Sequence, residues 1–408
     1  MQKNLKAVIR NGILFLLLFF IFYFYANYMY IGGFGIGYQY IGCAAVIMIG
    51  GLSFLVAPKF SAFFECIKDI AILSTPYLVC MLFSLGIWIF TFTGIRQMIS
   101  GFFAPSYIIL SISCVGCLVY LIGEKAVVYT FWAMSAAFGV MILRQIRLVG
   151  LGEFFYELYL LLASGSLDAL PAMRTLEGPR FSYCYGLYFL YFFFQRKTTA
   201  KGIFRVRMFV CILFFLIGFK RSCVLATAVG AAIVCFYMIW HKNRKRELIN
   251  LLIVCFMAFS FLYIPMVRYG LFERIVERYH INTSHRERLY NIYNYYYEYN
   301  PSYMGRGLGW VQNHLRGQEG IYAYDVHNEY LRNYIELGFW GYIFWALTIL
   351  PWVLKCSVTY KNPREDGLVA GSMVYMAVLY ITENIFLFYT FSITLSVVVM
   401  VSRQYGKE

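Results

Sequence analysis

Charged residues are scarce in this chain. Only 13% of its 408 residues are Asp, Glu, Lys or Arg, whereas 61% are hydrophobic. A soluble domain carries about 25% charged residues, and a chain this apolar would expose large hydrophobic patches to water. The composition therefore excludes a soluble globular protein and indicates a protein embedded in lipid.

Cysteine is missing from the two long polar segments of the chain, residues 144–180 and 268–327. Most of the 11 cysteines lie in apolar segments, as small core residues do, so no disulfide framework holds the polar segments together. Cys114 and Cys117 form a lone CxxC pair inside an apolar run, which is weak evidence for a metal or redox site. Neither polar segment shows a metal-binding cluster or the paired aspartates of a nucleotide-sugar enzyme, and no cofactor is expected.

The sequence contains no internal repeat and no low-complexity linker, which predicts a single integral membrane domain over residues 1–408. A spanning helix needs roughly 20 apolar residues. Twelve such segments predict an all-α polytopic protein with about twelve transmembrane helices: Val8–Asn27, Ile36–Ala57, Ile70–Thr93, Phe102–Ile122, Ala126–Leu143, Phe181–Phe194, Phe204–Phe219, Cys223–Trp240, Leu248–Val267, Phe339–Leu354, Gly367–Asn384 and Phe386–Ser402. The first has no small-residue cleavage site after it, so we expect a retained helix and not a signal peptide.

The basic loops predict the orientation. Twelve alternating spans place four basic clusters on one side, together with both termini: Lys3, Lys6 and Arg10; Arg196, Lys197, Lys201, Arg205 and Arg207; Lys242, Arg244, Lys245 and Arg246; and Lys355, Lys361 and Arg364. The positive-inside rule assigns that side to the cytoplasm. Residues 144–180 and 268–327 then form two external loops, which we expect to contain short amphipathic helices.

Lysine is almost absent from the predicted outer side. That side has 14 Arg and a single Lys, Lys220, whereas the inner side has 12 Lys and 8 Arg. The planar fork of arginine suits bidentate binding of phosphate, so the bias favours an external site for phosphate or pyrophosphate. Snorkelling at lipid headgroups and ion pairs with Glu273, Glu277, Glu287 and Asp325 are the alternative. The net charge of +15 is scattered over many loops, which argues against a nucleic acid partner.

A capping-box spacing in the second loop predicts a helix start. Ser284 and Glu287 have that spacing, and Pro301 should stop the helix after Asn300. Arg286 and Arg288 lie in the first turn, where a bound anion would offset the helix dipole; pairing with Glu287 and Asp325 is the alternative. The helix is crowded with tyrosines, among them Tyr290 and Tyr293, whose rings suit either sugar faces or a membrane interface.

Two further segments of this loop carry candidate residues. The glycine-rich run Gly305–Gly309 does not follow a strand, so it predicts a tight turn and not a nucleotide-binding loop. Residues 325–338 predict an amphipathic helix that ends at Gly338 and leads into the tenth span. His327 at its top is a candidate general base or phosphate ligand, with Asn328 beside it; a capping or structural role is the alternative.

Lys220 and Arg221 lie at the predicted external turn between the seventh and eighth spans. Two cations between apolar helices are unfavourable unless they are paired, and no acid is near them in sequence, so a ligand phosphate is a suitable partner. Arg180, before the sixth span, is a further candidate of the same kind.

Together these segments resemble the O-antigen polymerase and O-antigen ligase superfamily over about the C-terminal half of the chain. The matching motifs, in order, are Phe219-Lys220-Arg221-Ser222, Ser284-His285-Arg286, Gly305-Arg306-Gly307-Leu308-Gly309, and His327-Asn328-Glu329-Tyr330-Leu331 with Glu336-Leu337-Gly338. In this superfamily the turn is often Gly-Ser-Arg, whereas here it is Lys-Arg-Ser.

The resemblance implies an inverting, metal-independent glycosyl transfer from an undecaprenyl-pyrophosphate-linked glycan at the periplasmic face of the bacterial inner membrane. Arg221 and Arg286 would hold the leaving pyrophosphate, with Arg288 assisting, and His327 would act on the acceptor hydroxyl or assist the pyrophosphate. Lys220, Arg180, Asn328, Tyr290 and Tyr293 are expected to bind substrate. Besides membrane lipid, a chain-length regulator protein is an expected partner.

The sequence leaves the acceptor open. A polymerase joins one lipid-linked repeat unit to another, and the aromatic-rich character of the chain favours it; a ligase moves the polymer onto lipid A-core. A lipid-linked oligosaccharide flippase is the alternative of another class. Transporters tend to show internal repeats and ionisable groups near the bilayer midplane, whereas here the spans are nearly free of charge, with Glu383 near an outer end as the main exception.

Overall fold

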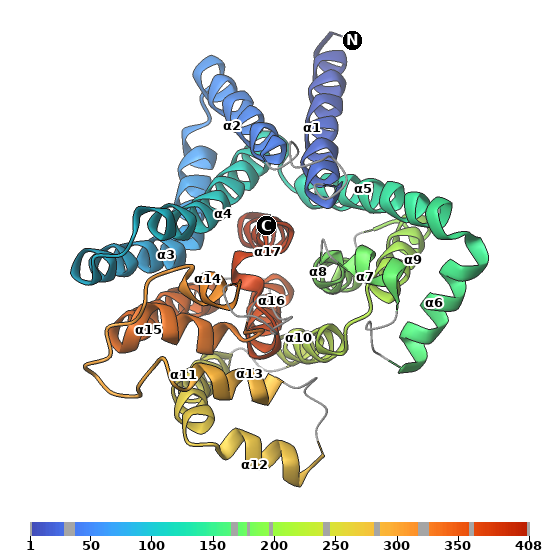
Figure 1. Ribbon diagram of the computed structural model, residues 1–408. Coiled ribbons are helices and arrows are strands. Elements are labelled where there is room, and N and C mark those ends of the chain that lie inside the picture. The colour runs from blue at the N-terminus through green and yellow to red at the C-terminus, as the bar shows by residue number, and fades with distance from the viewer. Residues whose placement is uncertain are drawn as a thin grey trace.

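The computed structural model is a bundle of long helices with several short helices between them in sequence (Figure 1). It describes residues 2–27, 37–164, 170–177, 180–195, 199–239, 245–280, 286–316, 326–358 and 363–405. Within these residues the regular elements are α-helices and one 3₁₀ turn, which confirms the predicted all-α class.

Each of the twelve predicted spans falls on a helix. These helices are α1 (Gln2–Asn27), α2 (Tyr38–Val56), α3 (Phe60–Thr91), α4 (Ile95–Ile122), α5 (Lys125–Val149), α8 (Phe181–Phe194), α9 (Lys201–Ile217), α10 (Arg221–Ile239), α11 (Lys245–Arg268), α15 (Glu329–Val358), α16 (Pro363–Thr382) and α17 (Tyr389–Tyr405). The shorter elements are α6 (Leu151–Ser164), α7 (Pro171–Glu177), α12 (Leu271–Arg278), α13 (Arg286–Tyr293), α14 (Trp310–Arg316) and the 3₁₀ turn η4 (Ile385–Leu387).

Six of the described helices, α1 to α5 and α10, are long and apolar enough to cross a membrane, and α8 is a shorter apolar helix. Large apolar side chains on these helices face outward, as expected for helices in contact with lipid: Leu55 is 76% exposed and Phe90 is 71% exposed. Several apolar helices of this length make the chain a multi-pass membrane protein. The number twelve remains a prediction.

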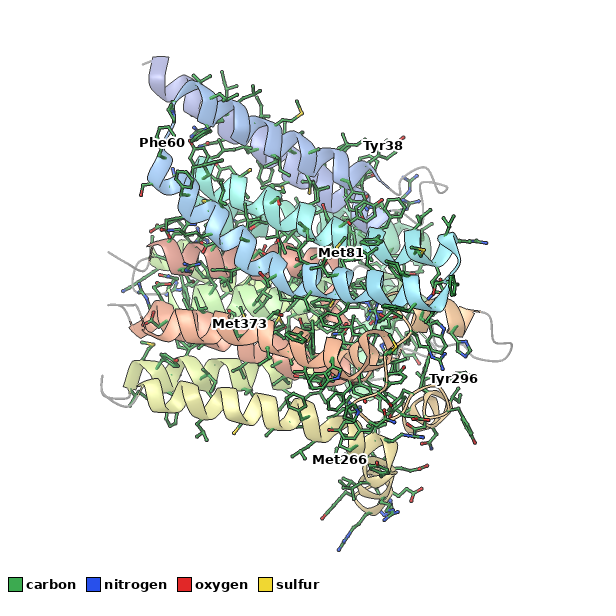
Figure 2. The ribbon with its side chains drawn as sticks, turned by 90° about the vertical axis from the view of Figure 1, so that its left-hand side faces the viewer. Tyr38, Phe60, Met81, Met266, Tyr296 and Met373 are labelled. Atoms are coloured by element: carbon green, nitrogen blue, oxygen red, sulfur yellow. The ribbon has the colours of Figure 1, made fainter. Side chains whose placement is uncertain are left out.

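The long helices run side by side, and the short ones gather at one end of the bundle (Figure 2). Tyr38 and Tyr296 mark that end, here called the outer end, and Phe60 marks the opposite, inner end. In Figure 1, α17 lies in the middle with α8 and α16 beside it, and the other long helices surround them. The central helices are buried on most sides; Tyr183, Tyr185 and Tyr188 of α8 are all fully enclosed.

Helices α10 and α16 pack closely because glycines face each other where they meet. A Cβ on Gly371 would lie 2.7 Å from Cγ2 of Val234 and 2.8 Å from the carbonyl oxygen of Gly230. Gly367 and Gly371 form a GxxxG pattern, which allows two helix backbones to approach in lipid. This contact places the outer end of α16, and hence Glu383 just beyond it, against the start of α10.

Candidate active site

Glu383 lies at the centre of a polar cluster at the outer end. Its side chain is 2% exposed, and Oε2 lies 3.6 Å from Nη1 of Arg180 and 3.6 Å from Nδ1 of His327. A buried carboxylate needs such partners because isolated charge is unfavourable in an apolar environment. Glu383 therefore brings together two predicted site residues that are far apart in sequence, Arg180 and His327.

Arg180 is held from several directions. It begins α8 with a left-handed backbone, φ 58°, and Nη1 also lies 3.9 Å from Oε1 of Glu177. Its guanidinium stacks over the ring of Phe388 at 4.4 Å. Burial alone would lower the pKa of Arg180, but Tyr183, Glu177 and Glu383 raise it above its usual value. Arg180 is thus a fixed cation.

Lys220 has an acidic partner that its sequence neighbours do not supply. Its Nζ lies 2.6 Å from Oε1 of Glu177. Glu177 ends α7 and Lys220 lies in the turn between α9 and α10, so the pair connects the first external loop to this turn. Lys220 thus has a carboxylate partner that is distant in sequence, and a substrate contact for it stays a prediction.

Arg221 is the first residue of α10, directly after Lys220, and its side chain is exposed. Three cationic residues, Arg180, Lys220 and Arg221, thus lie with Glu177 and Glu383 in one region. Arg180 lies near both carboxylates and Lys220 lies near Glu177, and Arg221 adds a third cationic side chain to the region. An anionic group of a substrate fits such a region.

His327 occupies a strained position in front of α15. Its φ of 50° is in the left-handed region, which non-glycine residues rarely adopt. Strain of this kind, of order 1–3 kcal/mol, is often found at functional sites. The side chain is 31% exposed, and Nδ1 is its buried atom, beside Glu383. The imidazole therefore has one shielded face and one accessible face.

Asn328 fixes the position of His327. Its Oδ1 accepts a hydrogen bond of 2.8 Å from the backbone N–H of Leu331, which makes Asn328 the N-cap of α15. Its Nδ2 donates a 2.7 Å hydrogen bond to the carbonyl of Ile381, two residues before Glu383. Asn328 therefore joins the start of α15 to the end of α16, and both of its side-chain hydrogen bonds are made within the protein.

A buried charged network continues down α15. Arg332 lies between Glu329 and Glu336, with its Nη1 3.8 Å from Oε1 of Glu329 and its Nε 3.5 Å from Oε2 of Glu336. Glu329 also accepts a hydrogen bond from the backbone N–H of Phe386, and Glu336 accepts one from that of Val311. These side chains hold α15 to η4 and to α14. The charges of Glu329 and Arg332 were not recognised from the sequence as a network.

The glycine-rich run, for which the sequence predicted a tight turn, docks onto α15. Helix α15 is broken at Gly338, where φ is 74° and ψ is −177°. The backbone N–H of Gly307 donates a 2.7 Å hydrogen bond to the carbonyl of Glu336, and that of Phe339 donates one to Tyr303. A Cβ on Gly305 would clash with the backbone at Gly338. The Gly-x-Gly run and the Glu-x-Gly motif are thus two halves of one contact.

Helix α13 begins at Arg286, close to the predicted start, but it ends at Tyr293 and not at Asn300. Arg268 donates a 2.6 Å hydrogen bond to the carbonyl of Asn294, and the hydroxyl of Tyr297 bonds to the Asn294 side chain. These contacts replace the next turn of helix. Ser284, His285, Asp325 and the side chains of Arg286 and Arg288 lie outside the described residues.

Tyr290 and Tyr293 are buried, 2% and 0% exposed. The ring of Tyr290 packs against Phe272 with centroids 5.6 Å apart, and the hydroxyl of Tyr293 bonds to the carbonyl of Val311. They form the core between α12, α13 and α14. In this structure the two rings therefore face protein neighbours.

No group of three His, Cys, Asp or Glu side chains in the described part of the chain is arranged to hold a metal ion. The site consists of cations, two carboxylates and an imidazole on a helical membrane scaffold. Such a site can neutralise an anionic leaving group and remove a proton from a hydroxyl.

The fold defines a multi-pass membrane protein with a polar cluster at one end of its helical bundle. Residues 206–346 match the family model described as O-antigen ligase. The match confirms the resemblance of this part of the chain to the O-antigen ligase and polymerase superfamily, and it supports a function of that general type. It includes Lys220, Arg221, α13, the glycine-rich turn and His327, but ends before Glu383. No curated protein matches the chain.

Proposed function

We propose that the chain is a surface-polysaccharide polymerase. It transfers a glycan from an undecaprenyl-pyrophosphate carrier onto a lipid-linked repeat unit, at the periplasmic face of the inner membrane. The observation that carries the proposal is the contact of His327 with Glu383, in the same cluster as the cations Arg180, Lys220 and Arg221. The O-antigen ligase match independently supports the general type of reaction, for a ligase as much as for a polymerase.

The acceptor hydroxyl is activated by His327. Glu383 lies at Nδ1, which favours the tautomer that carries its proton there and leaves Nε2 free to accept a proton. As the acceptor oxygen attacks the anomeric carbon from the face opposite the pyrophosphate, Nε2 takes the hydroxyl proton. A new glycosidic bond forms, the bond to the phosphate oxygen breaks, and the configuration at that carbon is inverted.

The leaving pyrophosphate gains negative charge as that bond breaks. Arg221 and Arg286, with Arg288 assisting, stabilise this charge, since a charge-assisted hydrogen bond strengthens where charge develops. Arg180 and Lys220 add to the positive field from positions fixed by Glu177 and Glu383. These cations supply the neutralisation that a metal ion gives in other transferases, so the proposed reaction is metal-independent.

Deletion of the gene, followed by electrophoresis of the surface polysaccharide, tests the proposal. A polymerase deletion leaves the core capped with a single repeat unit. Bare core with accumulated lipid-linked polymer would instead assign the ligase reaction onto lipid A-core, which the description of the family model favours. Complementation with Arg221→Ala or His327→Ala, each checked for its amount in the membrane, is expected to fail. A normal ladder with both variants would refute the assigned site.

A further inference from the structure

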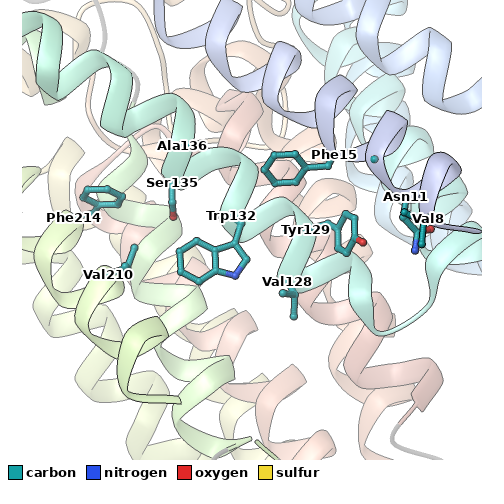
Figure 3. Close-up of a pocket in the computed structure, with 11 residues that line it drawn as sticks. Val8, Asn11, Phe15, Val128, Tyr129, Trp132, Ser135, Ala136, Val210 and Phe214 are labelled. Carbon is teal, nitrogen blue, oxygen red and sulfur yellow. The ribbon is translucent and has the colours of Figure 1, made fainter. Parts of the chain in front are cut away.

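A cavity of about 870 Å³ lies between α1, α5 and α9, away from the polar cluster (Figure 3). Its volume is within the roughly 300–1,000 Å³ of small-molecule sites. The lining residues are Val8, Asn11, Gly12, Phe15, Val128, Tyr129, Trp132, Ser135, Ala136, Val210 and Phe214. Val8, Gly12 and Ala136 are exposed, so the cavity opens on the side of the bundle.

The chemistry of this groove fits a hydrocarbon chain. Its walls are mostly aliphatic and aromatic side chains on three membrane helices, and in Figure 3 the rings of Phe15, Tyr129 and Trp132 lie along its length. The hydroxyl of Ser135 is already hydrogen-bonded to that of Tyr185 at 3.1 Å. An acyl chain therefore takes no hydrogen bond away from Ser135, and Asn11, whose buried Oδ1 has no partner among the described residues, is the polar exception in the lining.

Two cations continue the groove toward the inner end. Lys125 lies one turn before Val128 and Tyr129 on α5, and Arg207 lies one turn before Val210 on α9, so each shares a helix face with the lining residues. Arg207 stacks over the ring of Phe192 at 5.0 Å. Within the described residues, neither cation is within 4.0 Å of a carboxylate oxygen. An anionic headgroup at this end would meet both.

We propose that this groove binds a phospholipid of the inner leaflet, with an acyl chain along Trp132 and Phe15 and an anionic headgroup at Lys125 and Arg207. The inner leaflet carries anionic lipids, which attract basic side chains near the membrane surface. A polyprenyl carrier is the weaker occupant, since its pyrophosphate belongs at the outer end with Arg221. The inference rests on the predicted orientation and not on the transfer reaction.

Native mass spectrometry of the full chain in detergent tests this lipid site. The purified protein is mixed with phosphatidylglycerol or with phosphatidylcholine of the same acyl chains, and the fraction with one lipid bound is compared. Wild type is expected to retain phosphatidylglycerol at least tenfold better. Loss of both cations in Lys125→Gln/Arg207→Gln should lower that retention by roughly fivefold per cation. Arg10→Gln/Arg205→Gln removes the same charge from exposed positions off the groove and should change little.

A second variant tests the groove without changing charge. A Cβ on Gly12 meets no atom within 4 Å, so Gly12→Leu fits the fold and fills the groove. We expect it to abolish retention, whereas Gly51→Leu, an equally open glycine on α2, should not. Equal retention of the two lipids by wild type, or retention unaffected by both groove variants, would overturn the proposal. Displacement of phosphatidylglycerol by equimolar undecaprenyl phosphate would overturn it in favour of the carrier.

Discussion

His327 Nδ1 lies 3.6 Å from Oε2 of Glu383, a carboxylate that is 2% exposed and also contacts Arg180. This relationship joins a residue two positions before α15 to the residue after α16. In the proposed mechanism this contact orients the imidazole, with Glu383 as the positioning residue. The proposed mechanism depends on this contact more than on any other.

Replacement of Glu383 by Gln should impair the reaction while preserving the shape of the site. The amide cannot stabilise the imidazolium that forms when His327 accepts a proton, so we expect a loss of roughly 10²–10⁴ in rate, the size of a general-base contribution. Glu383→Asp, which keeps the charge, should retain more activity. The rate of polymer formation by the purified variants measures this. Equal activity of the Gln variant and wild type would exclude the positioning role.

The contact between Lys220 and Glu177 can be tested with single and double variants. If Lys220 acts mainly by pairing with Glu177, removing either charge alone leaves the other uncompensated, and removing both restores the balance. Polymer yield should therefore be lower in Lys220→Gln and Glu177→Gln than in the double variant. The matched change Arg221→Gln should not be rescued by Glu177→Gln. A double variant as poor as Lys220→Gln would instead assign Lys220 a direct contact with substrate.

Gly338 should tolerate no side chain. A Cβ there would clash with the backbone of Met304, and its φ of 74° disfavours other residues. Gly338→Ala should separate the glycine-rich turn from α15 and lower the melting temperature in detergent, with a destabilisation of roughly 1–3 kcal/mol. Gly86→Ala on α3, where a Cβ meets open space, is the control. Equal melting of the two variants would contradict the described contact.

Arg332 should be needed for folding. It is 4% exposed and lies between the fully buried Glu329 and Glu336. Arg332→Met takes the cation from two buried carboxylates, and breaking such a pair typically destabilises by roughly 3–5 kcal/mol. The amount of folded protein in the membrane should fall sharply. Arg278→Met on exposed α12 is the control and should accumulate normally. Normal accumulation of Arg332→Met would show that Glu329 and Glu336 do not depend on it.

The sequence allowed the helical scaffold to be predicted because apolar runs are a local signal. Each predicted span falls on a helix, from α1 to α17. Six of the described helices meet the criteria for a span by length and composition; α8 and α9, with 14 and 17 residues, are shorter. The end of α13 at Tyr293 could not be predicted, because it depends on contacts from Arg268 and Tyr297 with Asn294.

The contacts between site residues could not be predicted, because the residues that meet are far apart in sequence. Glu177 and Lys220 lie in different loops, and Glu383 follows α16 whereas His327 precedes α15. Only the presence of an acid near the end of an apolar run pointed to Glu383. The tyrosines illustrate the converse: their position in an external loop suggested sugar contacts, whereas Tyr293 packs on Val311 inside that loop.

The most direct test of the central claim is a polymerisation assay with the purified chain. Wild type and His327→Ala are reconstituted with an undecaprenyl-pyrophosphate-linked repeat unit as both donor and acceptor, in the presence of a metal chelator. The account predicts that wild type converts the repeat unit into a ladder of lipid-linked oligomers and that His327→Ala leaves it unchanged. An equal ladder from His327→Ala, or a wild-type reaction that stops when the chelator is added, would contradict the account.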